Sequence, residues 1–393
     1  MQVALAVTVA SAGVVVAQTG RALASVPAGY RADGVMTAAV RLPAADYPTP
    51  EAVRLTIDRV LSAVEARPGV SGAAVATRVP LSGGSPGSDV ALASDTFAPG
   101  VDRQTALRFV TPSYFDVIGT PVVEGRAFTA ADRDGSPRVV LINEALARRL
   151  GAGRSIVGDA VLFDALDFNP EPRTPWQVVG VVADARDRGP RDDVQPEVYL
   201  SMAQGPPGVL DWIGRQLLLV ARSDEAGATV GPPLLRDAVR DADPRLALFD
   251  VMSLDDRLRD YLSTERLLTW LLLPLGAIGL ALTGFGVFAL VLHIVTSRRR
   301  EIGIRLVLGA TPARLTAEAI RQGLRLLAAG GALGILGAVA ADRALSAVAF
   351  GTRATSPGLL AGVLTLVALV TLAAIWVPTR RAVRQDPGVV LRV

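Results

Sequence analysis

The chain has 393 residues, of which 50% are hydrophobic, and its mean hydropathy is +0.40. It is too apolar for an ordinary soluble protein and too polar for membrane helices alone, so both kinds of structure are expected. The sequence contains no cysteine, which excludes disulfides, thiolate catalysis and cysteine-ligated metals. It contains no lysine either, which excludes Schiff-base chemistry and a lysine-dependent phosphate loop. The formal net charge of +3 is small, so where the arginines cluster matters more than their total.

The first apolar segment is residues 3–17. A signal-peptide core has a similar length, but a signal peptide carries a positively charged region before that core, and this sequence has none. We therefore expect residues 1–20 to be a first membrane helix whose opening turns are missing. A signal peptide is the alternative.

The long segment at residues 21–265 alternates between strand-like and helical patterns, which predicts an α+β domain, with two subdomains as a variant. Helices are expected at residues 49–66, 143–150 and 233–241, the first with Thr49 as its cap and Pro50 in its first turn. Residues 82–100 and 164–175, rich in glycine, proline, serine and aspartate, are expected to be loops. The predicted strands are residues 35–40, 70–79, 139–142, 176–182, 198–200 and 217–221.

The same segment offers little for catalysis. The single histidine, His293, lies in a later apolar stretch, which excludes a Ser-His-Asp site in the long segment. Four aspartates between Asp184 and Asp193 admit a cation site, but three arginines lie among them, so a solvated loop is the preferred interpretation.

Three further membrane helices are expected at about residues 267–296, 323–345 and 358–378, since a span needs about 20 apolar residues. They hold no carboxylate in their apolar cores, which argues against a proton-driven transporter. Gly330 and Gly334 form a GxxxG pair that allows close helix packing, within one chain or between two subunits.

The arginine-rich connector after residue 296 and the arginine-rich tail after residue 378 are both expected in the cytoplasm. Residues 21–265 then lie outside. The predicted protein thus has four transmembrane α-helices, with a large α+β extracytoplasmic domain inserted between the first and second. The domain boundaries are 1–20, 21–265 and 266–393.

The connector sequence SRRREIGIRLVLGATPARLTAEAIR, residues 297–321, predicts a short amphipathic helix ended by Gly309. Glu301 and Arg305 are spaced to pair on one face of it. From these properties alone, a membrane-surface anchor and a docking element for a partner are equally good interpretations.

The motif REIGIRLVLGA at residues 300–310 resembles the signature of the MacB/FtsX-type ABC permeases. Further resemblances are PSYFDVIGTPVVEGRAFTAAD, VVLINEALARRL, VVGVVAD, EVYL and PTRRAVRQDPGVVL, so the likeness covers nearly all the chain. It is closest to permeases that carry the four-helix unit twice, and this resemblance implies that the chain would be the second half of such a permease.

The resemblance implies an inner-membrane permease with a periplasmic domain that couples ATP hydrolysis by a partner ATPase to domain movement, or mechanotransmission, for export of an unidentified substrate. This chain would be no enzyme and would hold no cofactor or metal, because ATP and Mg²⁺ belong to the ATPase on the cytoplasmic face. A second permease half or a homodimer, a periplasmic adaptor and the lipid bilayer are further expected partners, without nucleic acid. The implied docking residues are Arg300, Glu301, Ile302, Gly303, Arg305, Gly309 and Ala310.

Three other functions stay open at this point. A regulator of a cell-wall hydrolase and a lipoprotein-releasing permease would share the architecture. A receptor or scaffold without an ATPase is the third.

Overall fold

A computed structural model describes residues 2–95, 103–164, 174–205, 208, 215–223, 230–297, 321, 325, 328–340, 343 and 357–383. The chain divides into two compact units, each treated by itself. The helical unit comprises Met1–Ser25 and Leu262–Val393, and the sheet domain comprises Val26–Tyr261.

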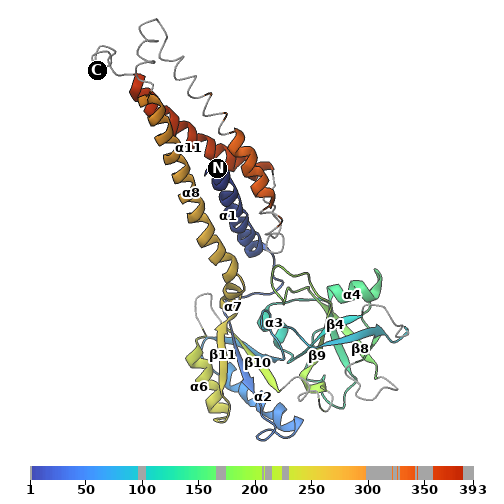
Figure 1. The fold of residues 1–393 in the computed structure, drawn as a ribbon. Coiled ribbons are helices and arrows are strands. Elements are labelled where there is room, and N and C mark those ends of the chain that lie inside the picture. The colour runs from blue at the N-terminus through green and yellow to red at the C-terminus, as the bar shows by residue number, and fades with distance from the viewer. Residues whose placement is uncertain are drawn as a thin grey trace, which may run out of the picture. The chain divides into compact units, whose positions relative to one another are not determined.

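The helical unit contains long apolar helices (Figure 1). Three stretches in the described part of the chain are long and apolar enough to cross a membrane, namely Val3–Ser25, Arg266–His293 and Gly358–Trp376. The predicted third span appears as a shorter apolar helix, Ala328–Ala340, and much of its surroundings lies outside the described residues. The labelled helices are α1 (Gln2–Ser25), α8 (Ser263–Ser297) and α11 (Pro357–Val383).

The first helix is part of the core of this unit. Val3, Val7 and Val15 of α1 are buried in one cluster with Leu359 and Val363 of α11. Branched apolar side chains without polar atoms suit a helix that is buried on most sides.

One half of the sheet domain is a four-stranded antiparallel sheet in the order β11-β1-β10-β2, which we call the flat half. Helices α2 and α6 pack on one face and α3 packs on the other (Figure 1). Because both faces are covered, most residues of these strands are apolar. The elements are β1 (Val35–Arg41), β2 (Val70–Ala76), β10 (Gln216–Ser223), β11 (Leu248–Ser253), α2 (Pro50–Glu65), α3 (Tyr114–Ile118), α6 (Pro232–Ala242) and α7 (Leu254–Tyr261).

The other half is a ring of strands in the order β4-β3-β7-β8-β6-β9, closed by parallel pairing of β9 with β4. We call it the ring half. Closure removes the exposed edges that an open sheet would present. Strand β5 pairs with β8 outside the ring. The elements are β3 (Gly87–Leu92), β4 (Gln104–Val110), β5 (Val122–Gly125), β6 (Val139–Asn143), β7 (Ala160–Phe163), β8 (Trp176–Val182), β9 (Glu197–Ser201), the 3₁₀ turn η1 (Met202–Gln204) and α4 (Glu144–Gly151).

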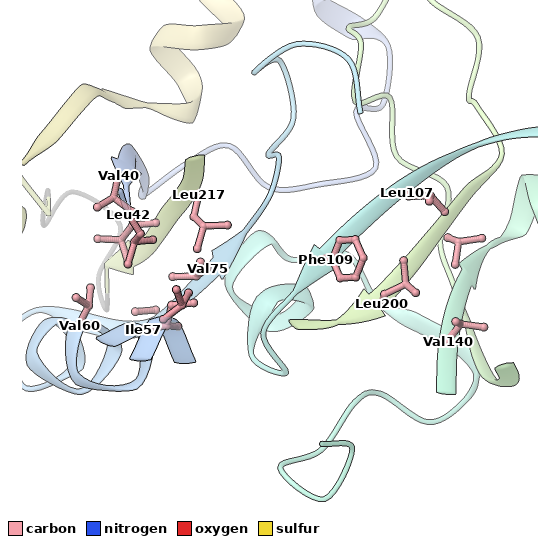
Figure 2. Packing of buried hydrophobic residues seen from close by; sticks show 14 of the residues in the cluster. Val40, Leu42, Ile57, Val60, Val75, Leu107, Phe109, Val140, Leu200 and Leu217 are labelled. Atoms are coloured by element: carbon pink, nitrogen blue, oxygen red, sulfur yellow. The ribbon is translucent and has the colours of Figure 1, made fainter. Parts of the chain in front are cut away.

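The two halves meet where β2 pairs with β4, through the single register pair Ala76 and Val110. Threonines on either side extend this joint: the backbone N–H of Val75 donates to the Thr111 hydroxyl at 3.0 Å, and that of Phe109 donates to the Thr77 hydroxyl at 3.2 Å. Figure 2 shows core side chains in two groups, one including Val75 and one including Phe109. The pairing between the two halves is short, but their buried side chains belong to one hydrophobic cluster.

The expected loop at residues 82–100 is wrong in part, because it contains β3. Val90 and Leu92 are buried, and β3 is paired on both sides, with β4 and with β7. Pairing with neighbours far along the chain overrides a local composition typical of loops. Most of the other expected loop, residues 164–175, lies outside the described residues.

Candidate functional site

The segment expected to dock an ATPase lies outside the described residues. These positions are Arg300, Glu301, Ile302, Gly303, Arg305, Gly309 and Ala310. Their assignment stays a prediction.

The structure places the GxxxG pair against the first helix of the same chain. A Cβ atom added at Gly330 would lie 2.7 Å from the Val3 Cβ, and one added at Gly334 would lie 2.6 Å from the Val7 Cβ. Real side chains do not approach so closely, so any larger residue would separate the two helices. The Thr8 hydroxyl also donates to the Gly334 carbonyl at 3.5 Å.

A buried charged cluster, which the sequence analysis missed, lies in the ring half. The Arg108 side chain on β4 is 3% exposed, and its Nη2 lies 2.9 Å from Asp187 Oδ2 and 2.8 Å from Glu197 Oε1. Its Nη1 donates to the Tyr114 hydroxyl at 2.7 Å, and the Tyr199 hydroxyl donates to Glu197 Oε2 at 2.9 Å. The cluster thus joins Arg108 of β4 to residues of β9, α3 and a loop.

Protonation decides the charge of this cluster. Burial raises the pKa of Glu197 well above its usual range; Arg108 opposes the rise, and Asp187 adds to it. Burial alone would lower the pKa of Arg108, but Asp187 and Glu197 reverse that effect and leave it raised. A protonated Glu197 beside an Arg108–Asp187 ion pair makes the buried cluster close to neutral, the least costly state in a low-dielectric interior.

The expectation of a solvated loop is confirmed for Asp192 and Asp193, which are exposed, and is wrong for Asp184 and Asp187. Asp184 accepts from the Ala145 backbone N–H at 2.8 Å and pairs with Arg148 at 2.6 Å, and Asp187 is held by Arg108. The alternative of a cation site finds no support either, because the described residues contain no cluster of metal-binding side chains. This loop therefore contacts α4 through Asp184 and β4 through Asp187.

A cleft of about 560 Å³ opens between the two halves of the sheet domain. This volume is within the range of small-molecule sites, ~300–1,000 Å³. Residues from α2 line one side, and turns of the ring half line the other, so the width of the cleft depends on the joint between β2 and β4. The charged residues that line it are Glu51, Arg54, Asp58, Asp132, Arg133 and Asp134.

Two family models match the chain. The model of the MacB-like periplasmic core domain matches residues 3–231, and that of the FtsX-like permease C-terminal domain matches residues 275–387. Together they reach both units of the structure.

Several relatives align with a large part of this chain. The macrolide export ATP-binding/permease protein MacB of Aggregatibacter actinomycetemcomitans is 27% identical over 57% of this chain and 33% of its own length. The MacB protein of Marinobacter nauticus is 28% identical over 68% of this chain and 40% of its own length. The uncharacterized ABC transporter permease YvrN of Bacillus subtilis is 28% identical over 58% of this chain and 55% of its own length. The chain therefore spans a third to two fifths of the MacB relatives.

Solved structures give weaker matches. The periplasmic region of MacB from Actinobacillus actinomycetemcomitans is 19% identical, with a TM-score of 0.38, and covers 59% of this chain and 94% of that one. The extracellular domain of YknZ, a noncanonic ABC-type transporter from Gram-positive bacteria, is 14% identical, with a TM-score of 0.34, over 55% of this chain and 100% of that one.

Proposed function

The chain belongs to the MacB/FtsX-type ABC permeases, and from this membership we propose that it couples ATP hydrolysis by a partner ATPase to movement of its sheet domain. The family and its homologues support a permease subunit of an ABC transporter. Mechanical coupling, export and the partner ATPase with its ATP and Mg²⁺ are parts of the proposal. So are a second permease half or homodimer and a periplasmic adaptor.

One observation carries the proposal: the sheet domain is inserted between two helices of the helical unit. Helix α1 ends at Ser25, one residue before the sheet domain begins, and α8 starts at Ser263, shortly after it ends at Tyr261. A change in the packing of α1 and α8 therefore acts on both chain connections of the domain. No polar pathway through the membrane helices is needed for such a motion.

For the cytoplasmic end we propose that Arg300, Glu301, Ile302, Gly303, Arg305, Gly309 and Ala310 contact the ATPase or shape the contact. The signature motif supports this choice. A charged pair at i, i+4 on a short helix suits a polar contact with a soluble partner better than immersion in lipid.

The direct test is ATPase stimulation. The full chain and its cognate ATPase are reconstituted in proteoliposomes, and hydrolysis is measured with Glu301→Ala plus Arg305→Ala. We expect the stimulation to fall about tenfold, since losing charge-assisted contacts worth ~1.4 kcal/mol in total has that effect. Arg314→Ala, in the same connector but outside the signature, is the control. Equal stimulation by the wild type and the double variant would refute the docking assignment.

A second test addresses the helices. Gly334→Leu should reduce coupling, because the added side chain collides with Val7 and overpacking costs ~1–3 kcal/mol. Gly362→Leu on α11 is the matched control, since a Cβ added there meets nothing within 4 Å. Stimulation that is equally unaffected by both changes would show that this helix contact is not part of the coupling.

The FtsX-like match also admits two alternatives, a non-transporting regulator of a cell-wall hydrolase and a lipoprotein-releasing permease. A hydrolase that co-purifies with the wild type and is activated when ATP is hydrolysed would favour the regulator over export. ATP-dependent release of a lipoprotein from the proteoliposomes would favour the second.

A further inference from the structure

A pocket of about 290 Å³ lies between α1 and α8 in the helical unit. Its lining includes Gly20 and Arg21 from α1, and Arg266, Thr269 and Trp270 from α8. On α8 the spacing of three and four residues puts Arg266, Thr269 and Trp270 on one helical face. A Cβ at Gly20 would meet no atom within 4 Å, so the α1 side of the pocket is open.

The pocket lies at a membrane boundary. Arg266 directly precedes the uncharged apolar stretch at residues 267–296, and Arg21 is near the end of α1. Both arginines are at the ends of their helices that connect to the sheet domain, since α1 ends at Ser25 and α8 begins at Ser263. The pocket is therefore at the surface of the leaflet on the sheet-domain side.

Arginines at this place are unexpected. Basic residues flanking spans gather on the cytoplasmic side, which is the side expected for the arginine-rich connector at residues 297–321. Two guanidinium groups line this one pocket, so an anion bound in it would have two cationic partners. Arginine binds phosphate with two parallel hydrogen bonds, which makes phosphate a well-matched anion.

We propose that this pocket binds the phosphate headgroup of an anionic phospholipid in the leaflet on the sheet-domain side. The volume suits a headgroup, being just below the range of drug-sized ligand sites. Trp270 is 78% exposed, as expected for a ring that lies among lipid headgroups. Leu267 and Leu271, each 60% exposed beside it, offer an apolar surface for the acyl chains.

Such a lipid would fill the space between the two helices that connect to the sheet domain. Its binding would thereby depend on how α1 and α8 are packed, whichever partner moves them. The inference holds for transport and for signalling alike, so its failure would leave the proposed function standing.

The test is native mass spectrometry of the full chain released from nanodiscs that contain equal amounts of phosphatidylglycerol and phosphatidylcholine. We expect the wild type to retain phosphatidylglycerol preferentially. Arg21→Gln plus Arg266→Gln should lower that retention about tenfold or more, because the two guanidinium groups supply the charge-assisted hydrogen bonds to the phosphate. Arg21→Lys plus Arg266→Lys, which keeps the charge, should restore part of it.

Arg41→Gln is the control, since Arg41 is an exposed arginine at the end of β1 in the sheet domain. Equal retention of the two lipids by the wild type, or unchanged retention by the Arg21 and Arg266 double variant, would overturn the proposal. Binding of inorganic phosphate by the detergent-purified chain with the affinity of the lipid would assign the pocket to a soluble anion instead. A dimer that the double variant dissociates, with no change in bound lipid, would assign the two arginines to a subunit contact.

Discussion

Asp243 in the flat half and Glu197 in the ring half are both buried, with side chains 4% and 5% exposed. Asp243 accepts hydrogen bonds from the Tyr47 hydroxyl at 3.0 Å and from Nη2 of Arg245 at 2.7 Å. Hydrogen bonding from Arg245 lowers the pKa of Asp243 and outweighs the opposing effect of burial. At Glu197 burial prevails and the pKa rises. Similar side-chain exposure thus accompanies opposite pKa shifts, since Glu197 lies deep in the protein and Asp243 lies near its surface.

The partners explain this difference. Arg245 and Arg59, which pair with Asp243, are exposed and keep most of their hydration. Glu197 instead shares the buried Arg108 with a second carboxylate, Asp187. One desolvated cation cannot compensate two desolvated anions, so one carboxyl stays neutral. Asp243 in the flat half is therefore paired with arginines that stay exposed, whereas Glu197 in the ring half is paired with an arginine that is itself buried.

The largest effect is expected from Arg108→Met. The change leaves Asp187 and Glu197 without their cation, and breaking a buried pair in this way costs ~3–5 kcal/mol. Urea unfolding of the full chain in detergent, followed by circular dichroism, measures the loss. The matched control is Arg154→Met, which removes an exposed pair with Asp159 worth ~0–1 kcal/mol. If both variants lose the same stability, burial of the Arg108 ion pairs does not account for the loss.

Next in size is Asn143→Ala in the ring half. The Asn143 side chain caps α4 by accepting from the Leu146 N–H at 3.0 Å, accepts from the Glu197 N–H at 3.0 Å and donates to the Gln195 carbonyl at 2.7 Å. Loss of a cap costs ~1 kcal/mol and an unsatisfied buried group ~1–3 kcal/mol more. In the same urea experiment, we expect the free energy of unfolding to fall by ~2–3 kcal/mol in total. Asn143→Asp keeps both acceptor bonds, so a loss as large as that of alanine would contradict this account.

The pH dependence of stability should differ between the halves. Because the folded pKa of Glu197 is raised, the folded state binds more protons than the unfolded state above about pH 4.3, the ordinary value for glutamate. Stability contributed by Glu197 therefore decreases as pH rises from there through the folded pKa. Melting temperatures of Glu197→Gln should lack this decrease. A wild-type slope that persists in the variant would assign it to another group.

Asp243→Asn tests the opposite pH dependence, a loss of stability on the acid side. The folded pKa of Asp243 is lowered, so its contribution is present above about pH 3.9, the ordinary value for aspartate, and is lost as pH falls through the folded pKa. The variant should be less stable than the wild type at neutral pH and should approach it in acid. Curves that stay parallel down to the lowest accessible pH would show that folding does not lower the pKa of Asp243.

Much of the fold could be predicted from the sequence where the pattern is local. The strand expected at residues 176–182 is β8, and the helices expected at 143–150 and 233–241 are α4 and α6, within a few residues. Long uncharged stretches likewise predicted α8 and α11. In each case periodicity or length within one segment sets the structure.

The buried cluster could not be predicted in this way. Arg108 lies in the run QTALRFV, where an arginine between Leu107 and Phe109 in a buried strand was the only local signal. Its partners Asp187 and Glu197 are about 80 residues or more along the chain, and only closure of the ring by β4 and β9 brings them together. From local composition alone, the loop that contains Asp187 was therefore interpreted as a solvated segment.

The smallest expected effect concerns the cap of α2 in the flat half. The Thr49 hydroxyl accepts from the Ala52 N–H at 3.1 Å, which confirms the cap predicted from the sequence. Unlike Asn143, this side chain is exposed and bonds to nothing else among the described contacts, so Thr49→Ala removes only the cap, worth ~1 kcal/mol. Ser62→Ala, on the exposed face of the same helix, should change stability by less than ~0.5 kcal/mol. If Thr49→Ala cost as much as Asn143→Ala, the second role of the Asn143 amide as a support for β9 would be disproved, because the capping bond alone would account for both losses.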